Sequence, residues 1–141
     1  MRNLRCLVGM ICVTWAAAGL AQADDWPQWL GPRGASEWHE EGIRESLPAG
    51  GLTHKWRVDC SYGYSGPVVA GGKVYLFDYE VTFGEVVNLA SRRERLKGLE
   101  RVHCIDAETG KVLWADASEV EYYVSYPGGP RATPAVDGDR V

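Results

Sequence analysis

The 141-residue chain contains 45% hydrophobic, 11% aromatic and 24% charged residues, and its formal net charge is −4. A chain of this length and composition can bury the core of one domain. Its one basic cluster, Arg92–Arg95, is offset by neighbouring glutamates, which argues against a nucleic acid as the partner. The abundant glycines suit turns and strands, so the composition favours an all-β fold.

The first segment, residues 1–23, has the pattern of an export signal. Arg2 and Arg5 precede an apolar stretch, Leu7–Leu20, and Ala21–Ala23 provides a small-x-small cleavage site. The apolar stretch is short, which favours a cleaved signal over a membrane anchor, and neither cysteine within it follows a lipoprotein-type motif. We therefore expect a secreted or periplasmic protein with no membrane span after cleavage.

Residues 24–51 are expected to form an N-terminal strap and loop. Trp26 and Trp29 stand three residues apart before Gly31-Pro32, a pattern of irregular backbone held by aromatic burial rather than of a helix. We interpret the segment as a strap packed on the rim of the fold, with a ligand-stacking surface as the alternative. The mixed charged run from Ser36 to Gly51 is predicted to be a connecting loop.

The next predicted elements are a strand and a hairpin. His54–Cys60 alternates apolar with charged residues, which indicates an amphipathic strand. After the turn cluster Ser61–Gly66, Pro67–Ala70 and Lys73–Asp78 flank a Gly-Gly pair and predict a tight hairpin. Val81–Lys97 has no convincing period and is predicted to be a long surface loop.

The clearest predicted element is a hairpin over Val102–Trp114. Its turn provides side chains that hydrogen-bond the backbone and a glycine that tolerates positive φ. The residues that define this motif are Asp106, Thr109, Gly110, Lys111 and Trp114.

The end of the chain repeats an earlier segment. Glu119–Tyr126 is β-prone, and Pro127–Pro130 breaks the pattern. Pro134–Val141 then matches Pro67–Val74 position for position, 67 residues later. This period exceeds a usual blade repeat of about 40–50 residues, which the Val81–Lys97 insertion would explain.

The D-x-x-T-G-K-x-x-W spacing of the Asp106–Trp114 motif resembles the repeat of quinoprotein-type, or pyrroloquinoline-quinone-like (PQQ-like), β-propellers. The opening W-x-x-W-x-G-P segment resembles the start of many exported members of that family. The resemblance implies that residues 52–141 form PQQ-like propeller repeats, with Trp114 packed between blades and Trp56 in the equivalent place. About one and a half blades would be present, so the ring is incomplete and the chain is expected to be an N-terminal fragment.

No catalytic, cofactor-binding or metal-binding residue is assigned from the sequence. The three histidines, at positions 39, 54 and 103, are scattered singly, with no second ligand at a metal-site spacing. Cys60 and Cys104 are the two cysteines after the signal. They remain open between a disulfide, which an exported protein favours, and two buried free thiols.

The leading functional hypothesis is a non-catalytic binding or scaffold module that contacts a protein or another extracellular ligand at a propeller face. Tyr64, Tyr126 and Arg131 are its possible ligand-face residues, because aromatic and guanidinium groups are common interface anchors. One alternative is a PQQ-dependent alcohol or sugar dehydrogenase with calcium, although the adjacent cysteine pair typical of that group is absent from this sequence. A second alternative is the propeller subunit of the outer-membrane barrel-assembly machinery.

Overall fold

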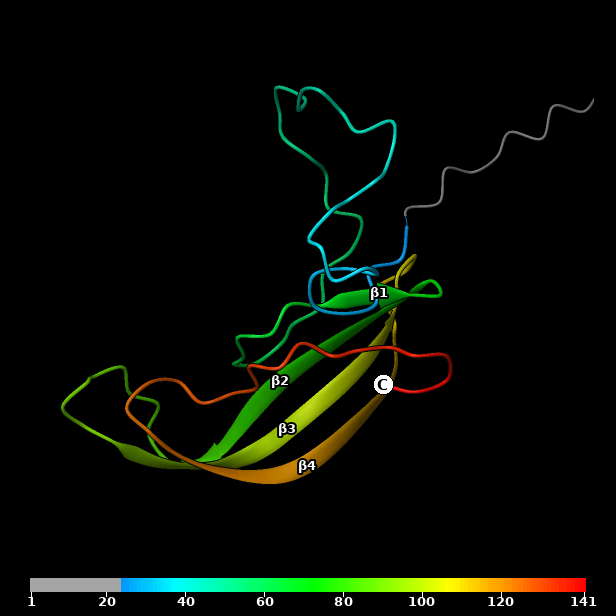
Figure 1. Cartoon of the computed structure of the whole chain (residues 1–141). Coiled ribbons are helices and arrows are strands. Elements are labelled where there is room, and N and C mark those ends of the chain that lie inside the picture. Colours follow the sequence, from blue (N-terminus) through cyan, green and yellow to red (C-terminus); the bar gives the residue numbers. More distant parts are fainter. Residues whose placement is uncertain (1–23) are drawn as a thin grey trace, which may run out of the picture.

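A computed structural model describes residues 24–141 as a single four-stranded antiparallel sheet, with no helix in that range. The strands β1 (Val68–Ala70), β2 (Lys73–Phe83), β3 (Glu94–Asp106) and β4 (Val112–Val124) are neighbours in chain order, and the sheet is strongly curved (Figure 1). The all-β prediction is confirmed. The predicted export signal, residues 1–23, lies outside the described residues. From residue 24 onward, no helix is long and apolar enough to cross a membrane.

The hairpin predicted around Gly71-Gly72 is confirmed. Ala70 pairs with Lys73 across a two-residue turn, and both glycines have positive φ, 56° and 72°. Such backbone angles match the twist of the flanking strands, and glycine adopts them without a Cβ clash.

The prediction of a long surface loop over Val81–Lys97 is wrong. β2 continues to Phe83 and β3 begins at Glu94, so only residues 84–93 form the connection. The sequence does not predict the first part of β3, because its charged residues face solvent and form ion pairs with the neighbouring strand, as Arg95 does with Glu121. Gly98 also lowers the strand signal, yet a Cβ at this position would lie 2.1 Å from the Glu80 carbonyl oxygen.

The strand predicted over His54–Cys60 is also wrong, because this segment is irregular. The outer edge of β2 is already occupied by β1 and, further along, by Tyr62, which pairs with Tyr79. Trp56 therefore does not take a place equivalent to Trp114. Its indole Nε1 donates to the Ala107 carbonyl oxygen at 2.8 Å instead.

The two faces of the sheet differ in chemistry, because side chains alternate along each strand. We call the face that carries Tyr75, Tyr79, Leu96, Cys104 and Tyr122 the core face. The opposite face carries most of the paired charges of the sheet, and we call it the charged face. Its residues are Asp78, Glu80, Arg95, Lys97, Arg101, His103, Glu119 and Glu121.

The core face is covered by segments from both ends of the described chain. Val68, Tyr75 and Cys104 form the buried cluster, with Val136 packed against it. The strap pairs with β1 at Trp26 and Val69, and the Pro27 carbonyl oxygen accepts a hydrogen bond from Val136 N–H at 2.8 Å. Figure 1 shows the final segment, in red, crossing the sheet.

The internal repeat extends to the backbone. Asp137 and Arg140 form an antiparallel bridge, and they occupy the positions that match the Ala70–Lys73 pair. Gly138 between them has φ of 60°, close to the 56° of Gly71. The end of the chain thus begins a second turn of the same kind.

Candidate functional site

The turn motif builds the β3–β4 connection as predicted. Asp106 Oδ1 accepts hydrogen bonds from Thr109 N–H at 2.8 Å and from the Thr109 hydroxyl at 2.7 Å, while Gly110 N–H donates to the Asp106 carbonyl oxygen. These bonds hold the pKa of the Asp106 carboxyl below its ordinary value. Lys111 follows the turn, and its backbone N–H donates a hydrogen bond to Thr109 Oγ1 at 3.3 Å. Asp106, Thr109 and Lys111 therefore all take part in hydrogen bonds within the turn.

Trp114, the last residue of the motif, is not buried within residues 24–141. It is 43% exposed and its ring lies 6.0 Å from that of Tyr75 at a tilted angle. The inter-blade burial that the resemblance implies is therefore not found among the described residues.

The three predicted ligand-face residues lie together. The Arg131 guanidinium carbon is 5.2 Å from the centre of the Tyr64 ring and 4.9 Å from the centre of the Tyr126 ring. The two rings meet edge to face, with centres 6.4 Å apart. We call this group the Tyr-Arg-Tyr cluster.

The Tyr-Arg-Tyr cluster is held by backbone contacts between two turns that are far apart in the sequence. Tyr64 N–H donates to the Pro130 carbonyl oxygen, and the Tyr64 hydroxyl donates to the Pro127 carbonyl oxygen, both at 2.9 Å. Gly129 has φ of 145°, and a Cβ there would lie 2.9 Å from the Tyr62 carbonyl oxygen. The glycine therefore allows the two turns to approach closely and sets Arg131 beside the rings.

A second polar group, which sequence reasoning missed, centres on Asp78 of the charged face. This carboxylate is only 1% exposed. Arg101 donates to both of its oxygens, from Nε at 2.8 Å and from Nη2 at 2.7 Å. Ser61 N–H donates at 2.7 Å, and His103 Nε2 lies 3.0 Å from Oδ1.

These contacts keep the Asp78 carboxyl ionised. Burial on its own would raise the pKa of Asp78, but the hydrogen bonds from Arg101, Ser61 and His103 together outweigh it and lower the pKa to about 2. The Ser61 hydroxyl lies 3.4 Å from Arg101 Nη2, so both polar groups of Ser61 serve the ion pair. The arrangement stabilises a carboxylate and does not activate the hydroxyl as a nucleophile.

Cys60 and Cys104 are free thiols in the structure. Cys104 is buried on the core face, whereas Cys60 is exposed and near Arg101 of the charged face. The expectation that both cysteines face inward is wrong for Cys60, because the segment that carries it is not a strand. The sheet lies between the two thiols.

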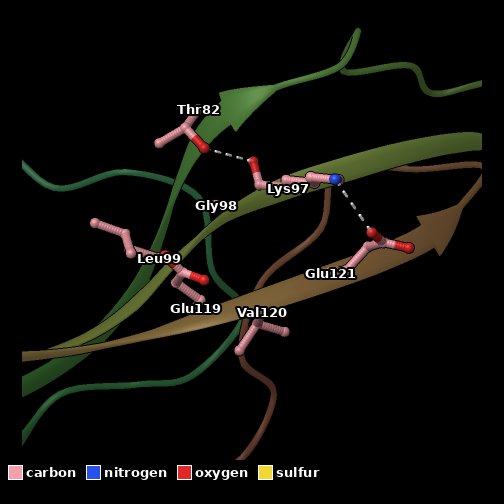
Figure 2. Close-up of a pocket in the computed structure, with 7 residues that line it drawn as sticks. All are labelled: Thr82, Lys97, Gly98, Leu99, Glu119, Val120 and Glu121. Atoms are coloured by element: carbon pink, nitrogen blue, oxygen red, sulfur yellow. Dashed lines mark hydrogen bonds and ion pairs between the residues drawn. The ribbon is translucent and has the colours of Figure 1, made fainter.

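The charged face also contains a shallow hollow of about 580 Å³ between β2, β3 and β4 (Figure 2). Lys97 lies 4.0 Å from Glu121, and the Thr82 hydroxyl donates to the Lys97 carbonyl oxygen at 3.2 Å. Its polar groups therefore bind mainly to one another.

The dehydrogenase alternative would need side chains that hold a calcium ion. From residue 24 to residue 141, no group of three or more His, Cys, Asp or Glu side chains is arranged to hold a metal ion. We derive no reaction step through these groups.

No protein-family model, no curated protein and no solved structure matches the chain. The conclusions on function therefore rest on the residues themselves.

Proposed function

We propose that this chain is a non-catalytic binding or scaffold module of an exported PQQ-like β-propeller protein, and that the Tyr-Arg-Tyr cluster contacts a protein partner. The observation that supports the proposal most is the position of Arg131 over two partly exposed tyrosine rings. A guanidinium held in this way loses less conformational freedom on binding than a free side chain does.

The charge of Arg131 defines the partner chemistry. The rings of Tyr64 and Tyr126 stack against the guanidinium, and none of the ion pairs found among residues 24–141 uses it. Its planar N–H groups fit a carboxylate in a two-point contact. The partner surface is thus expected to offer an aspartate or glutamate beside an apolar patch that covers the rings.

An NMR titration tests this proposal with a defined probe. A hexaglutamate peptide is added to the ¹⁵N-labelled protein, and the Arg131 Nε–Hε signal is followed. We expect this signal and the backbone signals of residues 126–131 to shift, and we expect the shifts to disappear in Arg131→Ala. Arg131→Lys is the matched control, because it keeps the charge but loses the planar donors and is expected to bind several-fold more weakly.

Two outcomes contradict the proposal. Equal binding by wild type and Arg131→Ala would remove Arg131 from the interface. In a parallel sample, tight uptake of added PQQ in the presence of calcium, followed by its absorbance after dialysis, would favour the dehydrogenase alternative instead.

A further inference from the structure

The free edge of β4 is the longest unpaired edge of the sheet. β3 pairs with one side of β4, and β4 ends the strand order of the described sheet. Its 13 residues are exposed or half-buried throughout, and they include the exposed apolar side chains of Val112, Leu113, Trp114 and Tyr123. An edge of this length presents a row of backbone donors and acceptors to a further strand.

The sequence of β4 carries only part of the usual protection of such an edge. Natural edge strands carry lysines, prolines or bulges that prevent pairing with another chain. Residues 112–124 contain no lysine, arginine or proline. Cys104 pairs with Trp114 and Ile105 with Val112, so Leu113 is an extra, bulged residue of β4 and the regular part of this edge runs from Trp114 to Val124. The pattern is apolar at both ends and acidic or small in the middle.

The backbone limits how two copies of β4 can pair. Along a strand, successive residues direct their N–H and C=O groups to alternate sides, so two identical antiparallel strands must pair residues of equal parity. The two-fold axis then passes through a residue, not between two residues. The midpoint of β4 is Ser118.

Pairing about Ser118 is self-complementary. The apolar ends of the regular part meet as Trp114 with Tyr122, and Val112 and Leu113 lie beyond it at the bulge. In the middle, each carboxylate faces an uncharged residue: Asp116 faces Val120, Glu119 faces Ala117, and Glu121 faces Ala115. Figure 2 shows Glu119 and Glu121 on one face of the sheet and Val120 on the other, as this arrangement requires.

The neighbouring registers are less favourable. An axis at Asp116 or at Glu119 places two identical carboxylates directly opposite each other, and an axis at Val120 pairs Glu119 with Glu121. Like charges directly opposite destabilise a pair of strands. An axis at Ala117 avoids this repulsion but shortens the pairing and places Leu113 against Glu121.

From this pattern we propose that β4 is a self-association edge: two copies of the chain pair through antiparallel β4 strands about Ser118 and join their sheets into one continuous sheet. The occupant of the edge is a second copy, because the order of residues along β4 complements its own reverse. This contact is separate from the Tyr-Arg-Tyr cluster, so either proposal can fail alone.

Disulfide trapping tests the register directly. In a Cys60→Ser background, Ser118→Cys places two thiols on the axis, where facing Cα atoms are about 4.5–5.5 Å apart and within disulfide range. Ala117→Cys is the matched control, since its Cα atoms would lie diagonally at about 7–8 Å, too far to bridge. Mild oxidation should cross-link Ser118→Cys and leave Ala117→Cys largely unlinked, with the bond located by peptide mass mapping.

Charge substitutions test the same register in solution. Sedimentation velocity of the wild-type chain should show a concentration-dependent dimer. Ala115→Lys faces Glu121 of the other copy and should lower the dimer Kd about tenfold, whereas Ala115→Glu should raise it by a similar factor, because the axis doubles each pair. Ala115 is exposed, so circular dichroism should show unchanged strand content for both variants.

Three outcomes would overturn the inference. The first is a wild-type chain that sediments as a monomer at all concentrations and yields no Ser118→Cys cross-link. The second is equal cross-linking of Ser118→Cys and Ala117→Cys. The third is a dimer that responds in the same way to Ala115→Lys and Ala115→Glu.

Discussion

At the residue scale, the strongest chemistry of this chain is concentrated on Asp78. One buried carboxylate accepts hydrogen bonds from a guanidinium, a backbone amide and a histidine ring. These donors come from β3 and from the segment before β1, so Asp78 ties that segment to the charged face of the sheet. A buried charge is tolerated when it is paired and hydrogen-bonded in this way.

Acid should therefore destabilise the fold through Asp78. The pKa of its carboxyl is about 2 in the folded chain and near its ordinary 3.8 in the unfolded chain, so the ionised group stabilises the fold above about pH 4. This stabilisation is lost as the pH falls through 2. Urea unfolding between pH 5 and pH 2 should show the loss in the wild type and a smaller loss in Asp78→Asn.

At neutral pH, Asp78→Asn should lower the free energy of unfolding by about 3 kcal/mol, because it removes one partner of a buried ion pair. Asp116→Asn, on the exposed part of β4, is the control and should change the free energy by less than about 0.5 kcal/mol. Equal effects of the two substitutions would show that the Asp78 contacts contribute no more to the free energy of unfolding than an exposed carboxylate does.

Only part of this residue-scale detail can be predicted from the sequence. Asp78 ends a predicted strand, and Arg101 and His103 stand two residues apart where the predicted hairpin begins, a spacing that places two side chains on one face of a strand. The pairing could not, because it depends on how far β2 and β3 extend and on Ser61 reaching over Asp78. The Tyr-Arg-Tyr cluster was closer to prediction, since all three residues were assigned to turns expected on one face.

At the scale of elements, substitutions at the glycines of two turns can distinguish the cost of a strained backbone from the cost of side-chain crowding. Gly71 and Gly110 both have positive φ, 56° and 72°. A Cβ at Gly71 would meet open space, whereas a Cβ at Gly110 would lie 2.6 Å from Cγ of the Trp56 ring.

Gly71→Ala should therefore cost about 1 kcal/mol from the left-handed backbone alone. Gly110→Ala should cost a further 1–3 kcal/mol, roughly, from overpacking against Trp56. Thermal or urea unfolding measures both, and the additional cost should shrink in a Trp56→Ala background. An additional cost that persists without Trp56 would contradict the packing of that ring on the turn.

Trp114 is the second element-scale test, and its exposure alters the expectation drawn from the family resemblance. A ring buried between blades would cost about 3–5 kcal/mol on truncation to alanine. At 43% exposure, with one tilted contact to Tyr75, Trp114→Ala should cost about 1–2 kcal/mol in dilute, monomeric protein. A loss near the larger range in urea unfolding would show that further surface covers the ring in solution.

Both failed element predictions have a tertiary cause. The sequence predicts a loop over residues 81–97 because charged, solvent-facing strand residues show little alternation of apolar and polar side chains. Ion pairs between neighbouring strands stabilise this part of the sheet, and such pairs leave no periodic pattern in the sequence. Alternating apolar and charged residues predict a strand over residues 54–60, but the outer edge of β2 is already occupied by β1 and Tyr62. The two hairpin turns were predictable because local backbone chemistry alone defines them.

At the scale of the whole molecule, the repeat found in the sequence explains part of the architecture. It identifies the Asp137–Arg140 turn as the counterpart of the first hairpin turn, and the structure reproduces that pairing. It does not predict that Val136 joins the cluster of Val68, Tyr75 and Cys104, because this contact depends on the path of the intervening residues across the core face.

The position of the strap also bears on the order in which the chain folds. The strap is synthesised before the sheet, yet its hydrogen-bond partners include Val69, Gly71 and Val136, and Val136 is more than 100 residues further along the sequence. The two hairpin turns, at Gly71-Gly72 and Asp106–Gly110, close short loops and are expected to form early, whereas contacts between distant residues require slower loop closure. We therefore expect the first described segment to leave the ribosome to reach its native place only after the hairpins have formed.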